Sequence, residues 1–130
     1  MIILTIRTDK PEAEIGLYDG KEQLLYETWQ AHRQLAETLH GKIEELLKGQ
    51  SKTWSDIAGI VCFQGPGSFT GLRIGLTVGN ALAYSYDVPI VATQDPEWLE
   101  RGVERLLQGE SDKRAMPFYG AEAHITPQKK

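Results

Sequence analysis

The feature that most constrains this chain is the stretch from Ile57 to Tyr86, IAGIVCFQGPGSFTGLRIGLTVGNALAYSY. Its apolar start predicts a buried strand, its Gly-Pro-Gly sequence a tight turn, and its remainder a helix with glycine at every fourth position. A strand, a glycine turn and a helix N-terminus form a common anion site, because free backbone N–H groups and the helix dipole meet there. Glycine at four-residue spacing indicates instead that another backbone approaches one face of the helix closely. The two interpretations imply different functions.

Length and composition limit the choice of function before any motif is considered. At 130 residues, 41% of them apolar and 25% charged, the chain resembles one soluble globular domain. The net charge of −4 offers no general attraction for a nucleic-acid backbone. The single cysteine, Cys62, lies in an apolar run, which excludes a disulfide framework or a thiolate metal cluster. No run approaches the roughly 18 apolar residues of a membrane span and no signal segment is evident, so we expect a cytoplasmic location without membrane contact.

The first half of the chain predicts three strands followed by a long helix. Met1–Ile6 and the alternating segment Ala13–Tyr18 predict two strands, and Gln23–Thr28 predicts a third. The Asp19-Gly20 pair between the second and third strands is a strong hairpin signal. Apolar residues then recur at helical spacing from Trp29 to Lys48. These signals predict an antiparallel meander packed against an amphipathic helix.

The second half predicts parallel strands joined by helices. A strand at Ile57–Phe63, a helix at about Thr70–Tyr86 and a strand at Val88–Val91 form a βαβ unit. Its two strands are parallel because a helix separates them. Asp95-Pro96 then predicts the N-terminus of a last helix, since proline is favoured at the first helical position.

The predicted order β-β-β-α-β-α-β-α defines the fold class. It corresponds to an α/β fold with a mixed five-stranded sheet, the ribonuclease-H-like topology that is also half of the actin-like (ASKHA) ATPase fold. We expect this domain at residues 1–109. A polar C-terminal tail is expected at residues 110–130, packing on the domain through Pro117–Tyr119.

The Gly65–Ser68 turn is the first candidate for binding chemistry. It lacks the lysine of the Walker phosphate loop and the GxGxxG spacing of dinucleotide folds. A hydroxyl near the helix start caps the helix whatever the turn binds, since it accepts a backbone N–H of the first turn. The pattern therefore favours a structural or interface role over a phosphate site. The residues of this glycine loop that could contact a ligand are Gly65, Pro66, Gly67, Ser68, Thr70 and Arg73.

The helix after this turn has an unusually wide apolar face. At about 100° per residue, its apolar and glycine positions cover about 220° and leave a narrow polar strip that includes Arg73 and Asn80. One sheet cannot cover so wide an arc, so the helix is expected to contact a second element. That element is either the Trp29–Lys48 helix of the same chain or a helix of a partner protein, and the pattern alone does not separate the two.

Histidines and carboxylates decide whether the chain can be an enzyme. His32 and His40 lie on the predicted Trp29–Lys48 helix, but no HxxxH or HExxH pattern accompanies them, so no metal site is expected. Ribonuclease-H-type nucleases hold two metal ions with a carboxylate in the first strand, and the matching position here is the cation Arg7. The turn after that strand has no glycine for a phosphate, and its Pro11 lacks a backbone donor. Both standard activities of the fold are therefore expected to be absent, with no catalytic residues and no cofactor.

These residues together resemble the TsaB (YeaZ) family, a glycoprotease-like group of the actin-like superfamily. The resemblance is carried by Ile60–Gly75 (IVCFQGPGSFTGLRIG), by the Leu-rich helix after His32, and by Ala81-Leu82-Ala83 with Val88-Pro89 downstream. It implies a non-catalytic scaffold subunit in the bacterial formation of threonylcarbamoyladenosine on tRNA. It also implies a heterodimer with a TsaD-type transferase paralogue, a TsaE-type ATPase as a further subunit, and contact with tRNA only through the complex.

In that family the partner interface is a helical bundle built from the first two helices. The resemblance implies that the same bundle forms here, and that the same surface can form a homodimer when the partner is missing. Carried over residue by residue, the implied interface consists of His32, Leu35, Leu39, Ile43, Gly71, Gly75, Val78, Gly79 and Leu82.

Two features depart from the family pattern. Arg7 stands where the family usually has an aspartate, and the family normally continues into a second domain of similar fold that 130 residues do not contain. Pro117–Tyr119 resembles the C-terminal tail of the family.

A rival interpretation from another class is a nucleotide-binding or hydrolytic enzyme that uses the Gly65–Ser68 turn. A third, a peptidase, has no nucleophile–base pair or metal motif to support it.

Overall fold

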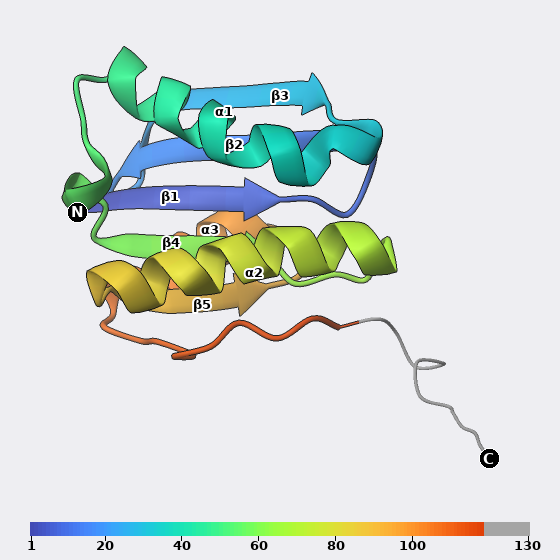
Figure 1. The fold of residues 1–130 in the computed structure, drawn as a ribbon. Coiled ribbons are helices and arrows are strands. Elements are labelled where there is room, and N and C mark those ends of the chain that lie inside the picture. The colour runs from blue at the N-terminus through green and yellow to red at the C-terminus, as the bar shows by residue number, and fades with distance from the viewer. Residues whose placement is uncertain (119–130) are drawn as a thin grey trace.

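The computed structural model describes residues 1–118, apart from the side chain of His32, and its centre is a mixed sheet of five strands. The strands are β1 (Ile2–Arg7), β2 (Glu12–Asp19), β3 (Glu22–Gln30), β4 (Gly59–Phe63) and β5 (Ile90–Thr93). They lie in the order β3-β2-β1-β4-β5 (Figure 1). The first three strands are antiparallel, whereas β1, β4 and β5 are parallel. The predicted ribonuclease-H-like α/β topology is confirmed.

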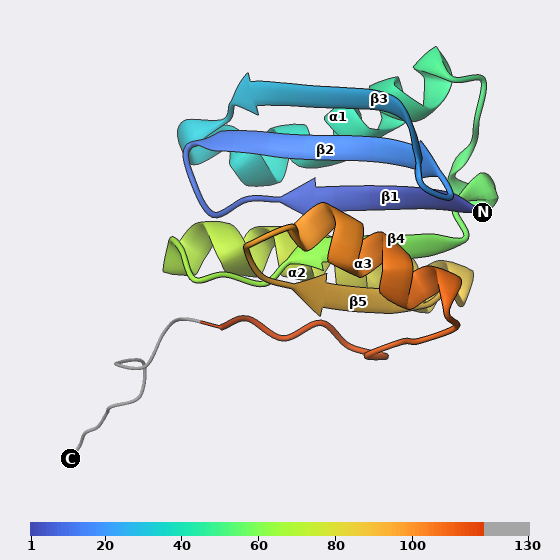
Figure 2. The ribbon, with the colours of Figure 1, turned by 180° about the vertical axis from the view of Figure 1, so that it is seen from behind.

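Helices cover both faces of this sheet. α1 (Leu35–Gly49) and α2 (Phe69–Tyr86) lie side by side on one face, and α3 (Trp98–Leu107) packs on the other face against β4 and β5 (Figures 1 and 2). Two short 3-10 turns, η1 (His32–Gln34) and η2 (Trp54–Asp56), precede α1 and β4. Within residues 1–118, no helix combines the length and the apolar character that a membrane crossing requires.

The central strand β4 shows how the layers meet. All five of its residues are buried, as expected for a parallel strand that is covered on both faces. On one face, Cys62 lies against Gly79 of α2, and on the other, Val61 lies against Gly102 of α3. The absence of a side chain at these two helical positions lets both helices approach the strand closely.

The helix predicted from Trp29 begins later, at Leu35. Trp29 instead belongs to β3, where it pairs with Ala13, because strand pairing overrides the helical spacing of the sequence. Its indole Nε1–H donates to Thr38 Oγ1 at 3.1 Å and joins the end of β3 to the first turn of α1. His32 therefore lies in the η1 turn and not in the long helix, which corrects its predicted position.

Residues 110–118 form a strap along the outer edge of β5 (Figure 1). Asp112 N–H donates to Ile90 O at 2.8 Å, and the Asp112 carboxylate accepts the N–H of Ala92 at 2.8 Å. Asn80 of α2 holds the strap at Ala115 through two hydrogen bonds: its Nδ2 donates to Ala115 O at 2.9 Å, and its Oδ1 accepts Ala115 N–H at 2.7 Å. The strap thus satisfies backbone groups of an edge strand that would otherwise be open to pairing.

The strap ends beside the turn that follows β4. Phe118 N–H donates to Gln64 O at 2.8 Å, and Gln64 Nε2 donates to Met116 O at 3.0 Å. Glycine is required at Gly65, because its φ is 118° and a Cβ there would overlap the carbonyl oxygen of Phe118. The sequence predicts that the tail packs on the domain through Pro117–Tyr119, and of these residues Tyr119 lies outside the described part of the chain.

Candidate functional site

The glycines of α2 face the sheet of the same chain. A Cβ on Gly75 would overlap Thr8 Oγ1, and one on Gly71 would overlap the carbonyl oxygen of Thr8. A Cβ on Gly79 would lie 2.5 Å from Cys62 Sγ, well inside van der Waals contact. The four-residue spacing therefore reflects close packing of α2 on the end of β1 and on β4. The expectation that these three glycines contact a partner helix is corrected, because their own sheet fills the space in front of them.

The apolar positions predicted as an interface on the first helix also belong to the core. Leu35, Leu39 and Ile43 are 5%, 0% and 0% exposed. A partner could reach them only if α1 left the sheet, so they are removed from the candidate interface. Val78 and Leu82 of α2 are half-buried and keep part of their surface exposed.

A groove between α1 and α2 remains at the surface. It is lined by Ala36 of α1 and, on α2, by Phe69, Thr70, Arg73, Ile74, Thr77 and Val78, and we call it the α1–α2 groove. Phe69 is 55% exposed, and the Arg73 guanidinium lies 5.2 Å from the centroid of its ring. Ile74 is half-buried beside them. Exposed apolar surface of this kind, with polar groups at its rim, suits contact with another protein.

The Gly-Pro-Gly turn packs against the turn that follows β1. Ser68 N–H donates to Asp9 O at 3.1 Å, and a Cβ on Gly67 would overlap the Asp9 side chain. Ser68 also caps α2, since its Oγ accepts Gly71 N–H at 3.3 Å. Thr8 Oγ1 donates to Gly71 O at 2.7 Å. The turn after β1 is thus packed on the start of α2. The exposed members of the predicted glycine loop are Pro66, Gly67, Ser68, Thr70 and Arg73, while Gly65 is buried.

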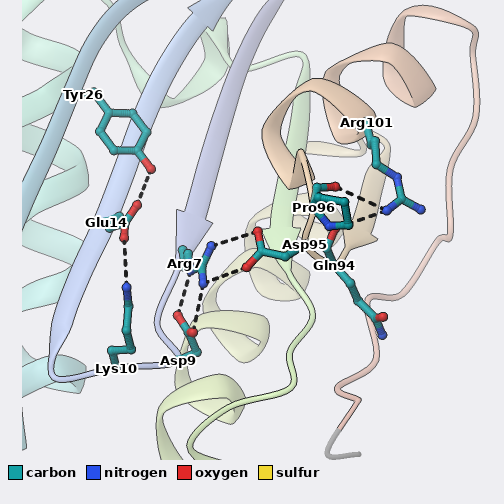
Figure 3. A network of polar contacts seen from close by, with 9 residues as sticks. All are labelled: Arg7, Asp9, Lys10, Glu14, Tyr26, Gln94, Asp95, Pro96 and Arg101. Atoms are coloured by element: carbon teal, nitrogen blue, oxygen red, sulfur yellow. Dashed lines mark hydrogen bonds and ion pairs between the residues drawn. The ribbon is translucent and has the colours of Figure 1, made fainter.

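Arg7 is the centre of a polar network at the carboxyl end of β1 (Figure 3). Its Nε and Nη2 donate to the two carboxylate oxygens of Asp9 at 2.9 and 3.2 Å. Its Nη1 and Nη2 donate to the two oxygens of Asp95 at 3.4 and 3.2 Å. The guanidinium carbon lies 3.7 Å from the ring centroid of Phe63 and 5.8 Å from that of Trp98. We call Arg7, Asp9 and Asp95 the Arg7 clasp.

The electrostatics of the clasp keep Arg7 charged. The side chains of Arg7 and Asp9 are 13% and 7% exposed, whereas that of Asp95 is 56% exposed. Burial lowers the pKa of Arg7, but the hydrogen bonds and charges of Asp9 and Asp95 outweigh it, so the pKa is raised overall. The clasp therefore consists of one permanent cation held between two carboxylates.

A second polar chain lies beside the clasp (Figure 3). Tyr26 Oη donates to Glu14 Oε1 at 2.5 Å, and Lys10 Nζ lies 3.8 Å from Glu14 Oε2. Burial, followed by the nearby Glu14, raises the pKa of Tyr26, so the phenol stays neutral. The aromatic ring of Tyr26 covers Gly16, where a Cβ would lie 2.7 Å from Tyr26 Cδ1. These groups bind one another, which makes them a structural network on the sheet.

The structure pairs two carboxylates that the sequence analysis did not connect. Asp9 follows β1 and Asp95 follows β5, and the carboxyl ends of these parallel strands meet at one edge of the sheet. The sequence could have predicted this proximity, because the turns after parallel strands, here β1, β4 and β5, lie together at one edge of a sheet. Among the side chains that the structure describes, no group of three or more His, Cys, Asp or Glu is arranged to hold a metal ion.

Comparison with known proteins identifies relatives that match large parts of this chain. A family model described as "TsaD: tRNA N6-adenosine threonylcarbamoyltransferase" matches residues 29–104, which is more than half of the chain. A protein from Escherichia coli (strain K12) named "tRNA threonylcarbamoyladenosine biosynthesis protein TsaB" is 27% identical over 129 residues, covering 94% of this chain and 54% of that protein. A Bacillus subtilis (strain 168) protein of the same name is 42% identical over 57 residues, covering 44% of this chain and 25% of that protein.

A solved structure agrees with these matches. YeaZ from Pseudomonas aeruginosa superposes with a TM-score of 0.67 at 26% identity, covering 72% of this chain and 44% of that chain. The chain thus spans about half the length, or less, of the relatives that it matches.

Proposed function

Since this chain belongs to the TsaB/YeaZ family and matches the model of TsaD, the tRNA N6-adenosine threonylcarbamoyltransferase, we propose that it is a non-catalytic subunit in threonylcarbamoyladenosine formation on tRNA. The proposed partner is a TsaD-type transferase paralogue. A TsaE-type ATPase joins the pair, tRNA is reached only through the complex, and the location is cytoplasmic. The names of the two TsaB relatives support the pathway.

The observation that carries this proposal is the α1–α2 groove. α2 presents Ile74, Val78 and Leu82 at four-residue spacing, each half-buried by its own chain, and Ala36 of α1 lines the groove together with Ile74 and Val78. Two neighbouring helices with apolar surface between them suit two helices of another subunit, because side-chain ridges pack into grooves. The TsaD family model spans residues 29–104, which include α1 and α2, so a transferase of this family has corresponding helices to offer.

The Arg7 clasp supports the non-catalytic part of the proposal. Asp9 and Asp95 stand at the edge of the sheet where α/β folds usually bind their ligands. Both carboxylates bind the same guanidinium, so its positive charge opposes the binding of a metal ion beside either of them. A second copy of the chain presents the same two helices, so the groove forms a homodimer when the transferase is missing.

Co-expression with the cognate TsaD-type transferase, followed by gel filtration, tests the proposal. We expect the two chains to elute together, and separate elution at micromolar concentration would refute a stable complex. A substitution at Gly75 is unsuitable for this test, because any side chain there collides with Thr8 inside the same subunit. Val78→Glu instead places a charge at the lining of the groove.

The rival function, nucleotide binding at the Gly65–Ser68 turn, is tested by calorimetry with ATP and magnesium. We expect no heat of binding. Saturable heat that is lost in Thr70→Glu would favour the rival, because this exposed substitution repels phosphate and leaves the helix N-terminus intact.

A further inference from the structure

The Arg7 clasp is built like a binding site for a planar cation. Its walls come from the carboxyl ends of three neighbouring parallel strands. Asp9 and Asp95 lie in the turns after β1 and β5 (Figure 3), and Phe63 is the last residue of β4. Two carboxylates supply negative charge, and an aromatic ring supplies a flat apolar face. This combination is the one that recognises guanidinium groups in proteins.

The observed contacts match that chemistry. The guanidinium of Arg7 uses Nε, Nη1 and Nη2 to reach both oxygens of Asp9 and both oxygens of Asp95, at 2.9 to 3.4 Å. Two-point contacts of this kind use the planar donor fork of arginine, which a lysine or a spherical metal ion does not offer. The guanidinium carbon lies 3.7 Å from the Phe63 ring centroid, which places the cation over the ring.

We propose that Asp9, Asp95 and Phe63 form a guanidinium-binding site that the chain fills with its own Arg7, and that this internal cation closes the carboxyl edge of the sheet to exchangeable ligands. A tethered group has a high effective concentration at its site, so a free cation must compete with it at a large disadvantage. An anionic ligand such as a nucleotide meets a cluster that keeps a net negative charge, since two carboxylates face the single guanidinium of Arg7. The site is therefore permanently occupied from within.

This occupancy also joins parts of the fold that are far apart in sequence. Arg7 links the turn after β1 to the turn after β5 across the end of β4. Asp9 in turn accepts the N–H of Ser68 at its backbone oxygen, at 3.1 Å, which connects the clasp to the start of α2. Loss of the guanidinium is therefore expected to loosen both turns and the N-terminus of α2, and a free guanidinium compound that refills the site is expected to restore them.

Chemical rescue of Arg7→Ala tests the proposal. The midpoint of thermal unfolding is measured for the full chain with increasing methylguanidinium chloride at millimolar concentration, with sodium chloride of equal ionic strength as the reference. Relative to wild type, we expect Arg7→Ala to unfold about 5–10 °C lower, because Asp9 is left buried without its partner. We expect methylguanidinium to recover part of this loss, and the double variant Arg7→Ala with Asp95→Ala to lose the recovery.

Arg101→Ala is the matched control. Arg101 donates to the backbone oxygens of Gln94 and Pro96, both at 3.4 Å, on the same turn as Asp95 (Figure 3), and no carboxylate of residues 1–118 binds it. Its removal is expected to cost little stability and to show no response to methylguanidinium. Equal recovery of both variants, or no recovery of Arg7→Ala, would overturn the proposal.

Two further readouts keep the proposal testable if Arg7→Ala does not fold. In the wild-type chain, magnesium or manganese ions, with or without ATP, are expected to leave the unfolding midpoint unchanged, and a saturable rise would show that the edge is open to ligands. In nitrogen-15 spectra of the wild type, the Nε–H of Arg7 is expected to exchange with water more slowly than that of the exposed Arg73, and fast exchange at Arg7 would contradict a filled site.

Discussion

Gly75→Ala tests whether the glycine spacing of α2 has an internal cause. The added Cβ would overlap Thr8 Oγ1 and would lie 3.1 Å from Thr8 Cγ2 and 3.2 Å from Thr8 Cβ. Thr8 is 2% exposed, and its hydroxyl donates to Gly71 O at 2.7 Å, so the threonine can yield only by giving up that hydrogen bond. The variant must therefore either move α2 away from the sheet or break a buried contact.

The expected cost follows from three opposing terms. Overpacking by one methyl group costs about 1–3 kcal/mol, and the lost Thr8–Gly71 hydrogen bond costs about 1 kcal/mol. Replacing glycine by alanine inside a helix returns about 1 kcal/mol. The sum predicts that Gly75→Ala lowers the free energy of unfolding by about 2 kcal/mol.

Gly41→Ala is the matched control on the neighbouring helix. Gly41 lies in α1 and is exposed, and within the described residues no atom outside the adjoining backbone of α1 lies within 4 Å of an added Cβ. The same substitution should therefore raise the free energy of unfolding by about 0.5–1 kcal/mol. Urea titration of both variants measures the difference, which we expect to be about 3 kcal/mol.

A double variant locates the effect at the predicted contact. Thr8→Ala removes Oγ1 and Cγ2, the two atoms nearest to the added Cβ at position 75. Only Thr8 Cβ, 3.2 Å away, remains. Gly75→Ala should therefore cost less in the Thr8→Ala background than in the wild type. The internal explanation of the glycine spacing is refuted if Gly75→Ala is as stable as Gly41→Ala. It is also refuted if the stability changes of Gly75→Ala and Thr8→Ala simply add in the double variant.

Three further predictions concern the strap and the core. Burial opposes ionisation of Asp112, but its hydrogen bonds with Arg105 and Ala92 outweigh this and lower its pKa, so the carboxylate stabilises the fold above about pH 4 and this contribution is lost as the pH falls through the folded-state value. Urea titrations should therefore show Asp112→Asn less stable than wild type near pH 7, with a difference that shrinks below about pH 4; a difference that is constant with pH would contradict the ion pair. Asn80→Ala removes both hydrogen bonds to Ala115 and should speed amide hydrogen exchange in the strap about 10-fold without changing β1 and β2, whereas unchanged exchange would show that other contacts hold the strap. Burial raises the pKa of the Cys62 thiol to about 12, so iodoacetamide at neutral pH should label the protein only after unfolding in urea, and fast labelling of the folded protein would contradict the packing under Gly79.

Local patterns carried most of the fold. The alternation in Ala13–Tyr18, the Asp19-Gly20 hairpin and the βαβ unit from Ile57 to Val91 predict the observed sheet, because each is settled by interactions within a short segment. The starts of two helices are errors. The last helix begins at Trp98 and not at Pro96, and Trp29 fits a helical stripe, but its pairing with Ala13 extends β3 through Gln30. That pairing depends on a strand far away in the sequence, which a periodicity does not contain.

The candidate site was less predictable, for the same reason. The glycines of α2 signal a close approach, but only the tertiary structure shows that Thr8 and Cys62 of the same chain make it. The sequence pattern fits an interface role and a core role equally well for Leu39 and Ile43, since both lie on one apolar stripe of α1. The sequence shows that Arg7 stands in place of a carboxylate, but it does not show that Asp95 binds Arg7. That contact depends on the meeting of parallel strand ends at one edge of the sheet.

The affinity of the cognate TsaD-type transferase for two charge variants tests the central claim most directly. Val78→Glu charges the α1–α2 groove, and Leu107→Glu charges a side chain that is 44% exposed on α3, on the opposite face of the sheet. Calorimetric titration of the transferase with each variant, after matching unfolding midpoints confirm that both are folded, gives the two dissociation constants. The proposal predicts that Val78→Glu binds at least about 30-fold more weakly than wild type and that Leu107→Glu binds within about 2-fold of it. Equal affinities of the two variants, or weakening by Leu107→Glu alone, would contradict docking through the groove.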